Sequence, residues 1–123
     1  MSDMLADFPE RLRGDPWSPA VDILETDDSV VVRLEMAGVR GDDLRVNVDG
    51  ELLRIRGIRR TPDTAGVRRL HQMEIAFGPF ETTVRLGVPF DRGGVTAHLE
   101  DGLLEVRLPK RGAVRVEIET EER

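Results

Sequence analysis

The feature that most constrains this chain is a hydrophobic period of two, which begins at Val21 and hardly gives way to a helical period afterwards. In "VVVRLEMA" and "LRVNV", apolar residues occupy alternate positions, and polar residues fill many of the positions between them. Successive side chains of a β-strand point to opposite faces of a sheet, so this alternation is typical of strands with one buried face. We therefore predict an all-β domain.

Further strands are predicted in the segments that share this alternation: "LLRIRG", "LHQMEIAF", "ETTVRLGV", "VTAHLE" and "LLEVRLP". Turn-forming residues separate them at short intervals, which is typical of an antiparallel β-sandwich. Asp101-Gly102 is the strongest hairpin signal, because glycine tolerates the positive φ of a tight primed turn. The polar stretch from Arg59 to Arg69 is the longest break between strands, and we expect a mobile loop there.

Size and composition limit the functions that this sandwich can have. The 123 residues suffice for one domain with a modest core, and they include no cysteine, which excludes disulfides and thiolate metal sites. The net charge of -6 argues against general binding of nucleic acid. We interpret the run of arginines between Arg54 and Arg69 as a solvated face or loop with ion pairs between subunits. The sequence shows no signal peptide and no membrane-spanning stretch, so we expect a cytoplasmic protein that binds no membrane.

Residues that commonly carry catalysis or bind cofactors are scarce or scattered. His71 and His98 each stand alone in a predicted strand, without a second histidine at ligand spacing. No glycine-rich phosphate loop is present, and the single lysine, Lys110, follows a proline after the last predicted core strand. Acid pairs fall at predicted turns, where carboxylates cap and solvate the chain. We therefore expect no catalytic residues, no metal site, no cofactor and no enzyme activity.

Two stretches of the sequence point to a known family. Together, "WSPAVDILETDDSVVVRLEMAGVRGDDLRVNVDGELLRIRGIR" and "AHLEDGLLEVRLPK" resemble the alpha-crystallin domain of small heat-shock proteins. The second stretch contains the most specific signature of that family, an alanine, three residues, Asp or Asn, Gly, an aliphatic residue and Leu: here Ala97, Asp101, Gly102, Leu103 and Leu104. The tail segment "VEI" resembles the I-x-I/V motif of the family, with Val116 and Ile118 as its apolar pair.

The resemblance implies an N-terminal arm (residues 1–16), an Ig-like alpha-crystallin domain (17–110) and a C-terminal extension (111–123). It also implies homodimers that assemble into larger oligomers and hold unfolding client proteins without ATP. In bacterial and plant members the dimer forms by strand exchange. The exchanged strand would be "LHQMEIAF", its acceptor would be "VDILET" of the other subunit, and the loop from Arg59 to Arg69 would reach across. The exchanged residues would be Leu70, Met73, Ile75 and Phe77.

The arm offers candidate contacts for clients: Leu5, Phe8, Leu12 and Trp17. These large apolar side chains lie on a segment that glycine and proline keep from packing as one rigid helix, so they can adapt to many partners. The alternative is that they pack against the sandwich or within the oligomer, and for Trp17 both roles remain open. The net negative charge would keep a complex with clients in solution.

For the tail, we expect Val116 and Ile118 to dock in a groove between "LRVNV" and "VTAHLE", on a neighbouring subunit or on their own chain. The walls of this groove would be Leu44, Val46, Val48, Val95, Ala97 and Leu99. The alternative is a disordered, solubilising tail in which the glutamates matter and the apolar pair does not. For the whole protein, the alternative to a holdase is a co-chaperone or adaptor of the related CS-domain type, which binds a folded partner. A carboxylate-based hydrolase is a more distant alternative.

Overall fold

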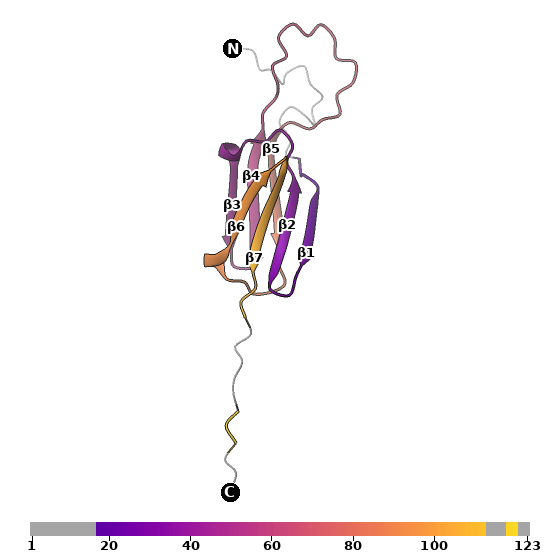
Figure 1. The fold of residues 1–123 in the computed structure, drawn as a ribbon. Coiled ribbons are helices and arrows are strands. Elements are labelled where there is room, and N and C mark those ends of the chain that lie inside the picture. The colour runs from indigo at the N-terminus through magenta and orange to yellow at the C-terminus, as the bar shows by residue number, and fades with distance from the viewer. Residues whose placement is uncertain (1–16, 113–117, 121–123) are drawn as a thin grey trace.

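The computed structural model describes residues 17–112 and 118–120. The strands between Val21 and Pro109 form a sandwich of two antiparallel sheets (Figure 1). The larger sheet has the order β1-β2-β7-β6, with β1 (Val21–Glu25), β2 (Ser29–Glu35), β7 (Leu103–Pro109) and β6 (Thr96–Glu100). The smaller sheet has the order β3-β4-β5, with β3 (Leu44–Asp49), β4 (Leu52–Arg59) and β5 (Gly78–Arg85). Two short 3-10 helices, η1 (Gly41–Asp43) and η2 (Arg92–Gly94), precede β3 and β6. The predicted antiparallel sandwich is confirmed.

The core lies between the two sheets and consists of residues at alternate positions of the strands. Val32 stands opposite Val106 across β2 and β7, and Leu34 stands opposite Leu104. These four side chains are at most 3% exposed, and Leu53 on β4 of the other sheet is fully buried. Removing one such side chain from water contributes roughly 1.5–3 kcal/mol, so this shared apolar layer holds the sheets together.

The Asp101-Gly102 turn joins β6 to β7 as the sequence predicts. Asp101 and Gly102 have φ angles of 52° and 78°, and the flanking residues Glu100 and Leu103 are paired. A side-chain carbon placed on Gly102 would lie 3.3 Å from the Cα atom of Ala37. This turn therefore requires glycine both for its positive φ and for the close approach of the neighbouring backbone.

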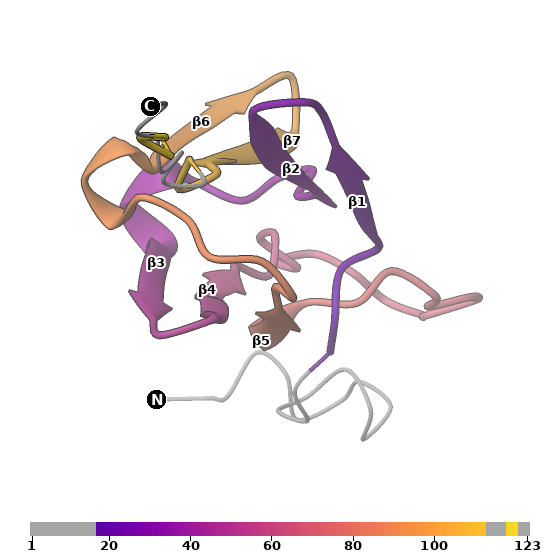
Figure 2. The same ribbon diagram turned by 90° about the horizontal axis from the view of Figure 1, so that it is seen from below.

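The segment between β4 and β5 differs from the sequence-based expectation. β4 continues to Arg59, and residues 60–77 form one long loop that projects from the sandwich on the side of β1 (Figures 1 and 2). The strand predicted for "LHQMEIAF" is absent from this single chain. A strand requires a hydrogen-bonded neighbour, and no strand in residues 17–112 stands beside this segment.

Most of the predicted arm and tail residues lie outside the described residues. This applies to Leu5, Phe8 and Leu12 of the arm and to Val116 of the tail motif. Ile118 is described and is 87% exposed.

Candidate functional site

β1 is a free edge of the larger sheet, and it carries exposed apolar side chains. One side of β1 pairs with β2 over its whole length, whereas the other side has no neighbouring strand among the described residues. Ile23 and Leu24 are 56% and 40% exposed. An edge of this kind presents unpaired backbone N–H and C=O groups, together with apolar surface, to a strand from another chain.

The loop of residues 60–77 carries further exposed apolar side chains. Ile75 is 62% exposed and Leu70 is 41% exposed, whereas Met73 and Phe77 are half-buried. All four residues predicted to exchange between subunits lie in this loop, which connects β4 to β5 and contributes no strand to either sheet.

β3 and β6 are the free edges of the two sheets on the opposite side of the sandwich (Figure 2). Alternate residues of these edges, together with Val95 just before β6, form an apolar strip, which we call the β3–β6 strip: Leu44, Val46, Val48, Val95, Ala97 and Leu99. All except Ala97 are partly buried and pack against the core. Ala97 is exposed, so the strip is least covered at its middle residue on the β6 side.

Trp17 packs against one end of the smaller sheet. Its ring centroid lies 5.2 Å from that of Phe80, and the guanidinium carbon of Arg59 lies 4.0 Å from the Trp17 ring centroid. The indole Nε1–H donates a hydrogen bond to the carbonyl oxygen of Gly78 over 3.1 Å. Of the two roles left open for Trp17, these contacts support packing against the sandwich.

Arg59 departs from the solvated face predicted for the arginine run. It ends β4, it is only 9% exposed, and its Nε has no hydrogen-bond partner within the described part of the chain. Burial lowers the pKa of Arg59, and the negative charge of Glu35 raises it. The guanidinium remains charged at neutral pH, and its position over the Trp17 ring compensates in part for lost hydration.

Two other arginines of this run lie at the surface and form pairs within the chain. Arg54 lies 3.5 Å from Glu81, and Arg60 donates two hydrogen bonds of 2.8 Å to the carboxylate of Asp43. The hydrogen bonds from Arg60 hold the pKa of Asp43 below its usual range. The run is therefore partly neutralised by carboxylates of its own chain.

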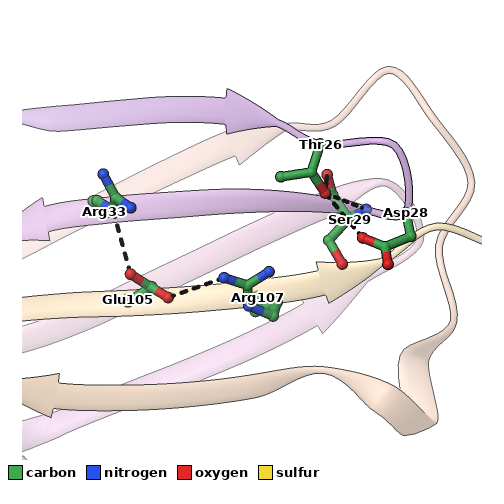
Figure 3. Close-up of polar contacts among 6 residues, drawn as sticks. All are labelled: Thr26, Asp28, Ser29, Arg33, Glu105 and Arg107. Atoms are coloured by element: carbon green, nitrogen blue, oxygen red, sulfur yellow. Dashed lines mark hydrogen bonds and ion pairs between the residues drawn. The ribbon is translucent and has the colours of Figure 1, made fainter.

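Polar contacts stabilise the β1–β2 turn and the outer face of the larger sheet (Figure 3). The amide N–H of Ser29 donates to the hydroxyl of Thr26 over 3.0 Å, which fixes the tight turn between the two strands. On the outer face, Glu105 lies between Arg33 on β2, at 3.3 Å, and Arg107, at 3.5 Å. The Thr26 contact thus joins β1 to β2, and the Arg33–Glu105 pair joins β2 to β7, while the other edge of β1 has no neighbouring strand in the described residues.

Side chains that could bind a metal ion are scattered over the described residues. In residues 17–112 and 118–120, no group of three or more His, Asp or Glu side chains is placed to hold a metal ion. His98 lies 3.0 Å from the carboxylate of Glu100 on an exposed strand, and His71 is exposed in the loop. No helix in this part of the chain is long and apolar enough to cross a membrane.

Two antiparallel sheets packed face to face, with free strand edges on both sides, define an Ig-like β-sandwich. Residues 22–121 match the model of the Hsp20/alpha crystallin family. The chain belongs to this family, and the resemblance inferred from the Ala97 to Leu104 signature is confirmed.

Individual relatives agree with this assignment. Small heat shock protein C2 of Rickettsia felis is 27% identical over 93 residues, which are 76% of this chain and 60% of the relative. Heat shock protein 16 of Schizosaccharomyces pombe is 34% identical over 97 residues, which are 76% of this chain and 66% of the relative. This chain therefore spans slightly less than two thirds of the length of these curated relatives. The solved small heat-shock protein of Xylella fastidiosa has a TM-score of 0.74 at 28% identity, covering 87% of this chain and 98% of that chain.

Proposed function

We propose that this protein is an ATP-independent holdase chaperone, which binds unfolding proteins and prevents their aggregation. The observation that carries the proposal is exposed apolar surface on a member of the Hsp20/alpha crystallin family. This surface includes Ile23 and Leu24 on a free sheet edge and Leu70 and Ile75 in the long loop. An unfolding protein exposes apolar side chains, and complementary apolar surface can bind them without a nucleotide.

The arm and the surface charge have separate roles in this proposal. We assign contact with clients to Leu5, Phe8 and Leu12, because their segment contains glycine and proline and can adapt to partners of different shape. The net charge of -6 would make the complexes of chaperone with client repel one another, which would keep these complexes in solution.

The holdase proposal predicts that the protein suppresses the aggregation of a heat-labile enzyme in the absence of ATP. Light scattering of the enzyme near its unfolding temperature should stay low at equimolar or higher chaperone. Replacing Leu5, Phe8 and Leu12 by serine should weaken the suppression without changing the circular dichroism of the sandwich, because the core cluster lies between Val30 and Leu108. Unchanged aggregation in the presence of the wild-type protein would refute the proposal.

We further infer that two copies pair by strand exchange through the loop. The free edge of β1 and the projecting loop of residues 60–77 lie on the same side of the sandwich (Figures 1 and 2). Pairing "LHQMEIAF" with β1 of a second copy would satisfy the unpaired backbone groups of β1 and cover Ile23 and Ile75. The exposure of Leu70 and Ile75 in the single chain supports the inference, because pairing with a second copy would cover these apolar side chains.

Dimers would then assemble further through the tail. The Xylella fastidiosa relative has a distinct high order structure, and we propose larger assemblies for this chain as well. Val116 and Ile118 would dock on the β3–β6 strip of a neighbouring copy, with Glu117 turned to water by the period of two.

Burying the two side chains contributes roughly 3–6 kcal/mol, whereas ordering three backbone residues costs about 3–6 kcal/mol. The net free energy of one contact is therefore close to zero. When several tails engage one assembly, their contributions add and the assembly is held more tightly.

Replacing both Val116 and Ile118 by serine is expected to reduce the assemblies to dimers, because the docked tail would lose its apolar contacts. Light scattering coupled to size-exclusion chromatography measures the mass of the particles. The matched control replaces Glu117 and Glu119 by serine, which removes two charges and keeps the apolar pair; its mass should stay that of the wild type. Assemblies that survive the first substitution and dissociate on the second would contradict docking by the apolar pair.

A further inference from the structure

The two ends of the long loop meet at one place on the sandwich. Arg59 is the last residue of β4, Gly78 is the first residue of β5, and these two residues stand opposite each other in the sheet. Residues 60–77 thus leave the sheet and return to it at neighbouring positions. The direction in which the loop projects therefore depends on how these two ends are held.

Trp17 contacts both ends of the loop. Its indole Nε1–H donates to the carbonyl oxygen of Gly78 over 3.1 Å, and its backbone N–H donates to that of Pro79 over 3.4 Å. Its ring packs against Phe80 near the start of β5 and against the guanidinium of Arg59 at the end of β4. We call Trp17, Arg59 and Phe80 the Trp17 clamp.

Arg59 depends on this clamp for its position. Its side chain is buried, and its Nε has no hydrogen-bond partner in the described residues, so the Trp17 ring is an important source of compensation for its lost hydration. Without the ring, the guanidinium would gain hydration by moving outward, and the flexible stem of arginine permits this movement. The end of the loop at Arg59 would then lose its contact with Trp17, and the end at Gly78 would lose a hydrogen-bond donor.

Trp17 is also the residue that joins the arm of residues 1–16 to the sandwich. We propose that the Trp17 clamp positions residues 60–77 for exchange with a second copy and couples this loop to the arm. The inference rests on the proposed strand exchange and names residues that control it. A loop with fixed ends loses less conformational freedom when it crosses to the partner, so the dimer is tighter. Coupling is reciprocal: a client that draws Trp17 out of the clamp would weaken the dimer.

Substitutions in the clamp test its effect on the loop. Trp17→Ala removes the ring and its N–H donor, whereas Trp17→Phe keeps a ring. The control is Phe90→Leu, because Phe90 is buried and bridges to Lys110 beyond the end of β7, away from the loop. For each variant, sedimentation gives the dimer dissociation constant, hydrogen exchange reports on residues 60–77, and calorimetry gives the unfolding temperature.

We expect Trp17→Ala to raise the dimer dissociation constant about tenfold, the effect of losing the pre-organisation of one or two large side chains. Hydrogen exchange in residues 60–77 should become faster, and Trp17→Phe should give intermediate values. Phe90→Leu should lower the unfolding temperature and leave the dissociation constant unchanged. If Trp17→Ala affects only the unfolding temperature, as Phe90→Leu does, the clamp is merely structural and the inference is wrong.

Coupling to the arm is tested by inserting a flexible Gly-Ser spacer between Pro16 and Trp17. Binding of an unfolding client should speed hydrogen exchange of residues 60–77 in the wild-type chain and have a much smaller effect in the chain with the spacer. Equal responses of the two chains would overturn the coupling. Failure of the proposed function would look different, because the wild-type protein itself would then remain monomeric or fail to suppress aggregation.

Discussion

Replacing residues 60–77 by a two-residue Asn-Gly turn should give a folded protein that sediments as a monomer. β4 and β5 are antiparallel neighbours, and Arg59 stands opposite Gly78, so a tight primed turn can close this hairpin without moving either strand. The buried core cluster contains no residue of the loop. The sandwich should therefore keep its far-ultraviolet circular dichroism and a cooperative unfolding transition, while the segment that would pair with β1 of a second copy is missing.

A full-length control separates loss of exchange from loss of the loop itself. Ile75→Glu changes a side chain that is 62% exposed in the single chain, so it should leave the stability of the monomer nearly unchanged. It should nevertheless weaken the dimer, because strand exchange would place this charge against an apolar edge. Sedimentation velocity at micromolar concentration measures both variants. A loop-replaced protein that remains dimeric there would show that another surface forms the dimer.

The sandwich could be predicted from the sequence because its signals are local. Alternation along each strand identifies the buried face without knowledge of the partner strand, as Val32 and Leu34 show. The Asp101-Gly102 turn is specified by the backbone requirements of the turn itself. Family membership followed from the same stretch, since its signature spans this turn and its flanking strands.

Val31 shows where a local pattern is insufficient. It lies on the face of β2 opposite the core, where alternation predicts exposure, and yet it is only 3% exposed. In the sheet it stands between Leu24 on β1 and Arg107 on β7. Long side chains on adjacent strands can cover such a position, and only the strand order and register reveal them.

The sequence around Arg59 predicts that this residue begins the polar loop, because other arginines surround it. A better signal was present, because Leu53, Ile55, Gly57 and Arg59 share one phase of the alternation. This phase places Arg59 on the inward face of β4, where a charged group needs a compensating neighbour. That neighbour is Trp17, which lies far away in the sequence, so composition alone could not identify the pair.

The segment "LHQMEIAF" illustrates a different limit. Its pattern indicates that it can form a strand, but a strand also requires a neighbouring strand, and no strand in the described part of the chain pairs with it. The sequence-based prediction of a strand and the loop found in the single chain are compatible if the partner is β1 of a second copy. The β3–β6 strip is similar: its residues could be named in advance, whereas its occupant stays a prediction.

Gly57→Ala should cause a large loss of stability in the sandwich itself. Gly57 lies within β4, opposite Leu44 on one side and Phe80 on the other. A side-chain carbon at this position would lie 2.6 Å from the backbone oxygen of Asp43 and 2.7 Å from Cζ of Phe80. The backbone oxygen cannot move aside as a side chain can, so the strands must shift. Overpacking of this kind costs roughly 1–3 kcal/mol, which corresponds to a fall in unfolding temperature of roughly 5–15 °C.

Gly87→Ala is the matched control for this substitution. A side-chain carbon on Gly87 meets no atom within 4 Å, and its φ lies outside the left-handed region, so alanine should be tolerated or slightly stabilising there. Calorimetry of both variants isolates the steric contribution at Gly57 from the general effect of exchanging glycine for alanine. The Phe80 ring also packs against the Trp17 ring. A displacement of Phe80 by Gly57→Ala should therefore loosen the contacts at the ends of the loop and speed hydrogen exchange in residues 60–77. Equal unfolding temperatures for the two variants would mean that β3 and β5 separate at little cost, and the tight packing described for this sheet would then be wrong.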